Sequence, residues 1–363
     1  MSLLIRNVVL NDSIVNLRTE GERIQFIGQG LPAPAEETID AHGELAVLPA
    51  FYNTHTHAAM TLLRGYADDM ELFEWLSRHI WPIEAKLEKE DVYHASRLAI
   101  LEMIRSGTVF FNDMYWFAAQ TLRAAEEMGT RACIGIQSIA NSDLAAKVDN
   151  DWLLQNRASF SSRIKLAYAP HAIYTVPESM LRDIAARANA NGDLIHMHLA
   201  ETKKEFDDCM KEHGVSPTRY VDDCGLMTSR SVFAHCVHLT DDDIALLAER
   251  GSILSHNPAS NMKLCSGMFR YDAAPARCRW TLGTDGVASN NCHSMLEAMK
   301  LCALRAKEAT GDPRSMRAEE AFRAATRSGA EAFGIDAGLV EPGRLADFIL
   351  VDLRNERLVP NHN

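Results

Sequence analysis

The stretch Asn53-Thr54-His55-Thr56-His57-Ala58 decides the fold of this 363-residue chain. It follows an apolar run, Leu45-Ala46-Val47-Leu48, that Pro49 closes. Side chains alternate between the two faces of a β-strand, so His55 and His57 point the same way. Two imidazoles side by side at the end of a buried strand provide half of a divalent-metal site. For this short pattern taken alone, two buried and hydrogen-bonded histidines are the alternative.

Outward from this stretch, the sequence repeats a pattern of strand, loop and helix. The helical segments have clear ends: Thr240 opens one that stops at Gly251, and Ser294 opens another that stops at Gly311. The apolar, strand-like runs are Leu45–His57, Thr108–Asp113, Arg131–Gln137, Ile164–His171, Asp193–Leu199, Ser231–His235, Ser252–His256 and Arg279–Asp285. Such a series of βα units, without a Gly-rich phosphate loop after any strand, favours a closed (β/α)8 TIM barrel over an open doubly wound sheet.

The two ends of the chain have a different pattern. Residues 1 to about 47 contain short strand-like runs, Leu3–Ile5 and Val8–Leu10 among them, separated by turn formers. A few short strands need a partner sheet, and Ala346–Asp352 near the other end is again strand-like. We therefore expect a small β-sandwich domain from residues 1–47 and 340–363, and a barrel over residues 48–339.

Composition excludes several classes of protein. The formal net charge of −12 leaves no basic surface for nucleic acid or anionic membranes. No apolar stretch is long enough to span a membrane, and the first residues lack the pattern of a signal peptide. The eight cysteines are scattered, which suits free thiols in a reducing compartment. We expect a cytoplasmic protein that binds a small molecule, and association into a homo-oligomer stays open.

Ionisable side chains gather where the predicted strands end. The strand ends carry His55, His57, His171, His198, His235, His256 and Asp285, and Glu201 follows His198 in the next loop. In a (β/α)8 barrel these ends form the active site. Three imidazoles and one carboxylate are a typical ligand set for zinc, so we expect His55, His57, His198 and Asp285 to bind one divalent metal. Zn²⁺ is the first choice and Fe²⁺ the alternative.

The other side chains at this rim have roles that follow from metal chemistry. A bound metal lowers the pKa of its water to roughly 7 and makes a hydroxide nucleophile available. Glu201 is placed to take the proton and deliver it to a leaving group. His235 and Asp285 could orient the water or hold the tetrahedral intermediate, so the catalytic residues are Glu201, His235 and Asp285. His196, deeper in the barrel, is assigned to the core or to a position behind the ligands.

Longer blocks of sequence carry a resemblance to a known family. They are the residues from Asn53 to Gly65, His198-Leu199-Ala200-Glu201-Thr202, Ala234-His235-Cys236-Val237-His238, Ser255–Asn261 and Leu282-Gly283-Thr284-Asp285-Gly286. Together they resemble the amidohydrolase superfamily over nearly the whole chain, in its deaminase and chlorohydrolase branch. With Trp75-Leu76 and the residues from His79 to Glu84, they look most like the 5-methylthioadenosine/S-adenosylhomocysteine deaminases.

The resemblance implies a metal-dependent aminohydrolase that removes the C6 amino group of an adenine nucleoside. The products would be the inosine analogue and ammonia, formed by attack of a metal-bound hydroxide. By the same analogy Glu84 accepts hydrogen bonds from the ribose hydroxyls, as suits a carboxylate with two acceptor oxygens. Trp75 would pack on the 5′ substituent, and His171 and Glu201 would contact the substrate.

Two features depart from the family pattern. Members that act on S-adenosylhomocysteine must hold its amino-acid carboxylate, yet the third barrel strand ends in Ile136-Gln137-Ser138-Ile139, with no arginine before Arg157. This favours methylthioadenosine, adenosine or another 5′-modified adenosine over S-adenosylhomocysteine. The sequence also stops at Asn363, where family members continue, so we expect the C-terminal part of the β domain to be incomplete.

Two rival functions remain. A hydrolase of the same superfamily could remove chloride or an amine from a triazine, pyrimidine or guanine ring, and such a substrate has no use for Glu84. A non-catalytic binding module with this fold would be expected to lose its metal ligands or its proton shuttle. Since all four proposed ligands and Glu201 are present, an enzyme is favoured.

Overall fold

A computed structural model describes residues 1–140 and 142–361. It contains two compact units, one of Met1–Phe51 with the segment from Thr326 onward, and one of Tyr52–Ala325. The domain boundaries expected from the sequence, at 47/48 and 339/340, stay a prediction. Their outer limit at residue 363 lies outside the described part of the chain.

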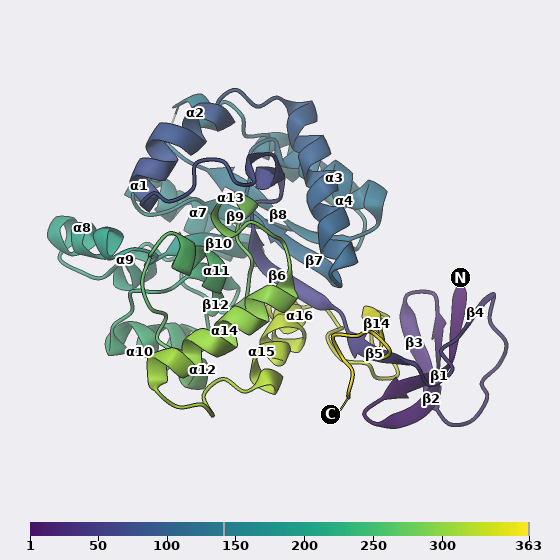
Figure 1. Cartoon of the computed structure of the whole chain (residues 1–363). Helices are drawn as coiled ribbons and strands as arrows, with labels where there is room; N and C mark the ends of the chain where they lie inside the picture. Colours follow the sequence, from purple (N-terminus) through teal and green to yellow (C-terminus); the bar gives the residue numbers. More distant parts are fainter. Residues whose placement is uncertain (141, 362–363) are drawn as a thin grey trace. The chain divides into compact units, whose positions relative to one another are not determined.

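The larger unit is built on a parallel sheet that forms the predicted barrel (Figure 1). Its strands lie side by side in sequence order: β6 (Phe51–Thr56), β7 (Thr108–Asp113), β8 (Arg131–Ser138), β9 (Ile164–Pro170), β10 (Leu194–Leu199), β11 (Ser231–His235), β12 (Ile253–His256) and β13 (Arg279–Leu282). The first and last strands meet through the Asp285 N–H, which donates to the His55 carbonyl at 3.0 Å, and the Thr284 N–H, which donates to Asn53 Oδ1 at 3.0 Å. These bonds bring the two ends of the sheet together, and the fold class is confirmed.

Helices follow each barrel strand and surround the sheet (Figure 1). After β6 come η1 (Ala58–Leu63), α1 (Leu72–Glu74), η2 (Trp75–Ile80), α2 (Trp81–Glu84) and α3 (Lys89–Arg105). The next connections contain α4 (Ala118–Met128), α5 (Ser142–Ala145), α6 (Asn150–Asn156), η3 (Arg157–Ser159), α7 (Glu178–Asn191), α8 (Lys203–His213) and α9 (Pro217–Asp223). The last ones contain α10 (Asp241–Arg250), α11 (Pro258–Lys263), α12 (Ala274–Arg277), α13 (Val287–Asn290), α14 (Met295–Thr310) and α15 (Ala318–Ala325).

The helix ends follow the signals in the sequence. Thr240 caps α10, because its side chain accepts from the Asp243 N–H while the Asp243 carboxylate accepts from the Thr240 N–H. Gly251 ends the same helix at φ +69°, a conformation that glycine adopts at little cost. Ser294 caps α14 in the predicted place.

One predicted strand is divided in two. The run Leu45–His57 forms β5 (Leu45–Pro49) and β6, which belong to different sheets. Pro49 has no N–H to continue a ladder, and the Ala50 N–H donates to the Asp347 carbonyl in the smaller unit. The apolar run alone could not show this division, because both halves are apolar and form strands.

The smaller unit is a mixed sheet in the order β14 (Phe348–Asp352), β5, β1 (Ser2–Leu10), β2 (Ser13–Glu20) and β3 (Arg23–Gly28), with β4 (Glu37–Asp40) beside β1. The two short runs expected at its start form the single strand β1 with a bulge between Ile5 and Val8. At the bulge Asn7 has φ +54°, and its N–H donates to Asn16 Oδ1. The core of the sheet includes Ile5, Val8, Leu17, Ile24 and Val47. Among the described residues, no helix is long and apolar enough to cross a membrane.

Gly283 tests how closely the barrel ends are packed. A Cβ at this position would lie 2.9 Å from both the backbone N and O of His55 and would also meet Asn257 Oδ1. We predict that Gly283→Ala lowers the free energy of unfolding by about 3 kcal/mol because neither backbone atom can move aside. The control is Gly311→Ala, at φ +65° with open space around it, which should cost only about 1 kcal/mol. Urea denaturation measures both, and equal losses would contradict the close packing.

Candidate active site

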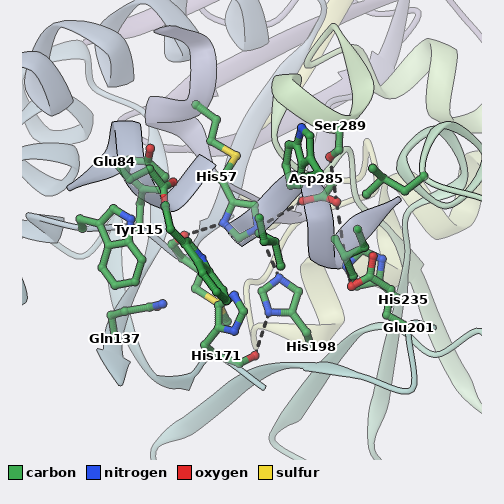
Figure 2. A pocket seen from close by; sticks show the side chains of 18 of the residues that line it. His57, Glu84, Tyr115, Gln137, His171, His198, Glu201, His235, Asp285 and Ser289 are labelled. Atoms are coloured by element: carbon green, nitrogen blue, oxygen red, sulfur yellow. Dashed lines mark hydrogen bonds and ion pairs between the residues drawn. The ribbon is translucent and has the colours of Figure 1, made fainter. Parts of the chain in front are cut away.

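The side chains predicted for the site come together at the carboxyl ends of the barrel strands, around one pocket (Figure 2). Its lining includes His57, Trp75, Glu84, His171, His198, Glu201, His235 and Asp285. His55 is fully buried beside them. His256 also ends a strand, but its ring stacks on Phe269 and its Nε2 lies 2.7 Å from the Tyr271 hydroxyl, so it stays outside the pocket lining.

Backbone carbonyls fix the tautomers of two of these histidines. His57 Nδ1 lies 2.6 Å from the Met114 carbonyl oxygen, and His198 Nδ1 lies 2.8 Å from the His171 carbonyl oxygen. A carbonyl only accepts, so both Nδ1 atoms donate, and in the neutral rings the lone pairs are on Nε2. The two Nε2 atoms face each other at 3.3 Å. Two lone pairs cannot bond to each other, so their approach favours a cation between them.

His55 presents its Nε2 to the same place. Its Nδ1 lies 2.8 Å from Nε2 of the buried His196, so His196 lies behind His55. His55 Nε2 is 3.3 Å from Asp285 Oδ1 but has no hydrogen-bond partner among the described residues. Burial lowers the pKa of His55 to about 4, an effect that Asp285 only partly offsets. His55 is therefore a neutral ring with a free lone pair.

Asp285 is an ionised carboxylate at the centre of this cluster. Its Oδ1 lies 3.2 Å from His57 Nε2, and its Oδ2 accepts hydrogen bonds from Ser260 at 2.5 Å and Ser289 at 3.1 Å. Burial raises the pKa of Asp285, but the contacts with His55 and His57 outweigh burial and hold that pKa well below its usual range. Burial lowers the pKa of His57, but the contact with Asp285 outweighs burial and raises this pKa to about 9. The position strongly favours positive charge.

This donor set fits a divalent metal. Among the described residues, two groups have ligand atoms within 4.8 Å of one another: His55, His57 and His198, and His55, His235 and Asp285. Imidazole nitrogens and an ionised carboxylate are the donors that zinc sites use, and a metal here would replace the proton that His57 otherwise holds. The structure thus brings together the four ligands expected from the sequence, with His235 at their edge.

Glu201 lies beside this cluster on the pocket wall. Its Oε2 is 3.8 Å from His235 Nε2, and its Oε1 accepts a hydrogen bond from Ser266 at 3.3 Å. Burial raises the pKa of Glu201, which favours a role for this carboxyl group in accepting and donating protons. His235 is held by Asn261, whose Oδ1 lies 2.8 Å from His235 Nδ1.

The opposite part of the pocket contains a third buried carboxyl group, Glu84 (Figure 2). Burial raises the pKa of Glu84 to about 7, although the neighbouring Trp116 indole and Tyr115 phenol lower it. Three buried polar atoms here, Trp116 Nε1, the Tyr115 hydroxyl and Gln137 Oε1, have no hydrogen-bond partner that meets the usual geometry among the described residues. These polar atoms line a pocket where a bound molecule can complete them.

Trp75 and His171 complete the predicted set. Trp75 begins η2, a π-helical turn that is rare outside functional sites, and this turn directs Trp75 and Leu76 into the pocket wall. His171 Nδ1 lies 2.9 Å from the Thr175 hydroxyl. Burial lowers the pKa of His171 to about 3, so the ring is neutral.

Sequence reasoning missed several residues of this pocket. Tyr115 and Trp116 directly follow β7, so the rule that strand ends form the site would have found them had it been applied to aromatic side chains as well as ionisable ones. Gln137 was considered only as the absence of an arginine. Asn261 and Ser289 lie on α11 and α13, and the sequence carries no signal for their contacts.

The comparisons with known proteins agree with this geometry. A model of the amidohydrolase family matches residues 46–362. The chain is 46% identical over 352 residues to a 5-methylthioadenosine/S-adenosylhomocysteine deaminase of Archaeoglobus fulgidus, covering 96% of this chain and 83% of that protein. It is 41% identical to a 5′-deoxyadenosine deaminase of Methanothermobacter thermautotrophicus, covering 95% and 82% of the two chains. The structure superimposes on a zinc-bound adenosine deaminase of Xanthomonas campestris with a TM-score of 0.92 at 32% identity, covering 100% and 87%.

The raised pKa of Glu84 makes a prediction about stability. The folded-state pKa of about 7 exceeds the ordinary 4.5, so folding favours the protonated acid. The resulting stability is present below pH 4.5 and is lost as the pH rises through 7. We predict that the unfolding free energy of Glu84→Gln minus that of the wild type rises by about 2–3 kcal/mol from pH 5 to pH 8. Urea denaturation at the two pH values measures this change. The exposed Glu319→Gln should show a constant difference, and a constant difference for Glu84→Gln would contradict the buried charge.

Proposed function

The chain belongs to the amidohydrolase family, and we propose that it hydrolytically removes the C6 amino group of an adenine nucleoside. The products are the corresponding inosine analogue and ammonia. The observation that carries the proposal is a single pocket that joins the imidazole and carboxylate cluster and Glu201 to the buried Glu84. One end of such a pocket suits hydrolysis, and the other suits a vicinal diol.

His55, His57, His198 and Asp285 would hold the metal, which we propose is zinc. A zinc ion acidifies water to a pKa of roughly 7 and so supplies a hydroxide nucleophile at neutral pH. The carbonyls of Met114 and His171 accept from the Nδ1–H groups of His57 and His198, so Nε2 of each ring is directed at the cluster and is the atom available to a metal. Ser260 and Ser289 hold the carboxylate of Asp285 in place.

Glu201 moves the protons of the reaction. Its carboxylate takes a proton from the attacking water and delivers it to the purine ring nitrogen or to the departing amine, so that ammonia leaves. Its raised pKa suits both steps, since the group must be a base before attack and an acid afterwards. His235, held through Nδ1 by Asn261, presents Nε2 within 3.9 Å of Asp285 Oδ2 and orients the oxygen that attacks.

Glu84, Trp75 and His171 bind the nucleoside in this proposal. The two oxygens of the Glu84 carboxylate accept from the ribose 2′- and 3′-hydroxyls. The Trp75 ring packs on the 5′ substituent, and the neutral His171 contacts the purine or the sugar. Glu84 must be ionised to accept both hydrogen bonds, so substrate binding requires a pH near or above 7.

The 5′ substituent is neutral in our proposal. The described residues that line the pocket include neither lysine nor arginine. Arg157, the first arginine after the third barrel strand, pairs with Asp193 at 2.7 Å, near the start of β10 and so at the opposite end of the strands. Methylthioadenosine, 5′-deoxyadenosine and adenosine therefore suit the pocket better than S-adenosylhomocysteine. A cytoplasmic location and the absence of nucleic-acid partners stay predictions from the sequence.

A spectroscopic assay tests the reaction and this preference together. We predict that the zinc-loaded protein converts the adenine chromophore of methylthioadenosine, 5′-deoxyadenosine or adenosine to hypoxanthine. For S-adenosylhomocysteine, kcat/KM should be lower by at least about tenfold, because its carboxylate finds no cationic partner. Strong turnover of S-adenosylhomocysteine would contradict the neutral 5′ site, and no turnover of any of the four would contradict the function.

Glu84→Ala separates a nucleoside deaminase from a hydrolase of another ring. Loss of two hydrogen bonds to a carboxylate should lower kcat/KM for the nucleoside on the order of 100-fold or more. The exposed Glu319→Ala serves as the control and should leave the rate unchanged. If Glu84→Ala keeps the wild-type rate on the best substrate, a ring without ribose becomes the better candidate.

Metal removal tests the proposed ligands. We expect atomic emission to find about one zinc per chain, and dialysis against a chelator to abolish activity and lower the melting temperature, since a ligand that binds only the folded state stabilises it. Added zinc should restore both. His198→Ala should bind zinc much more weakly than Cys265→Ala, an exposed potential ligand outside the cluster. Full activity in the metal-free protein would exclude the proposed mechanism.

A further inference from the structure

We propose that Glu205 is the positioning residue that sets the location of Glu201, an inference that rests on the proposed role of Glu201 in proton transfer. Glu205 does not line the pocket, and it acts on Glu201 through the backbone. The argument begins with the turn that joins β10 to α8.

This turn has a conformation that requires support. Ala200, directly before Glu201, has φ +50°, in the left-handed region that a residue with a Cβ adopts at a cost. The Ala200 carbonyl accepts hydrogen bonds from the N–H groups of Val237 at 3.0 Å and His238 at 2.9 Å. The peptide before Glu201 is thereby linked to the turn that follows His235.

The Glu205 carboxylate binds the other side of this turn. Its Oε1 accepts from the Ala200 N–H at 2.9 Å, and its Oε2 accepts from the Glu201 N–H at 2.8 Å. Two successive N–H groups directed at one anion form the concave arrangement in which proteins also bind external anions. Here the anion is part of the chain, and each of its oxygens is committed to one amide.

Glu205 is itself held rigidly. It is 3% exposed and lies in the first turn of α8, where its N–H donates to the Thr202 hydroxyl at 3.1 Å. Burial raises the pKa of Glu205 to about 7, while the two backbone hydrogen bonds lower it. Burying a carboxyl group is costly, and capping of a helix does not require a buried one. We therefore expect a further role of Glu205 in this turn.

That role is to fix the position of Glu201, the proposed proton shuttle. With Ala200 and Glu201 fixed from both sides, the Glu201 carboxylate lies 3.8 Å from His235 Nε2 and accepts from Ser266. Misplacing a catalytic group by about 1 Å can lower a rate on the order of 100-fold. A change at Glu205 should therefore affect the chemical step more than substrate binding.

Glu205→Gln is the sharpest test. The amide keeps the size of the side chain but presents an N–H₂ group to one of the two backbone N–H groups. We expect kcat to fall on the order of 10- to 100-fold, with KM changed less than about threefold and zinc content unchanged. Glu205→Asp, which keeps the charge but shortens the reach, should give an intermediate kcat and serves if the amide variant folds poorly.

Asp243→Asn is the matched control. Asp243 is also 3% exposed and occupies the same position in the first turn of α10, where it accepts from the Thr240 N–H far from the pocket lining. It should lower the melting temperature and leave kcat at the wild-type value. If Glu205→Gln behaves like Asp243→Asn, or loses activity only through loss of zinc, Glu205 is a capping residue and the inference is wrong.

Hydrogen exchange gives a readout that does not depend on the reaction. In the wild-type protein the amides of Ala200 and Glu201 should exchange slowly, and Glu205→Gln should make them exchange at least tenfold faster while the amides of α10 stay unchanged. Unchanged exchange at these two amides overturns the inference. A wild-type chain inactive on every nucleoside overturns the proposed function instead, and the exchange measurement still decides whether Glu205 fixes the turn.

Discussion

The Nε2 atoms of His55, His57 and His198 converge beside the Asp285 carboxylate, and this convergence governs the rest of the site. His55, His57 and His198 each use Nδ1 for a partner within the protein, so each directs Nε2 inward. Without a cation, the Nε2 lone pairs would face one another inside the protein, and burying polar atoms without a partner is costly. The arrangement is stable only with positive charge at its centre. A metal site of this kind is thus specified by where the protons are as much as by where the ligands are.

The barrel supplies the rigidity that this electrostatic cost demands. Hydroxyl groups inside the sheet join distant strands: Thr54 Oγ1 lies 2.7 Å from Ser255 Oγ and 2.8 Å from Thr281 Oγ1. Asn112 Nδ2 donates to the Thr54 carbonyl at 2.9 Å. These bonds lie one layer below the histidines and cross-link β6, β7, β12 and β13. The strand carrying both His55 and His57 is held on each side, so neither ring can turn away from the cluster.

The sequence predicts the barrel and the ionisable half of the site because both follow from spacing. A strand of period two places His55 and His57 on one face, and the ends of parallel strands meet at one rim, so His198, His235 and Asp285 could be assigned to the site without coordinates. The division of the first run at Ala50 could not be predicted, since both halves are apolar. Asn261 and the carboxylate of Glu205 were also out of reach, because their roles are contacts across loops that no periodicity records. Glu84 and Trp75 came from the family resemblance alone, whereas His171 was also placed at the rim as the end of a strand, and the contacts of all three with substrate remain proposals.

Several residues near the active rim adopt left-handed backbone conformations without being glycine. Ala200, His235, Cys236 and Asp285 have φ values of +50°, +72°, +50° and +63°, and each costs on the order of 1 kcal/mol relative to relaxed backbone. A screen for heat resistance will favour glycine at Ala200 or Cys236, because glycine relieves the strain. The more flexible turns will then hold Glu201 and His235 less precisely in the active site. In this enzyme the route to greater thermal tolerance passes through positions distant from the rim, such as the exposed faces of α3 and α14.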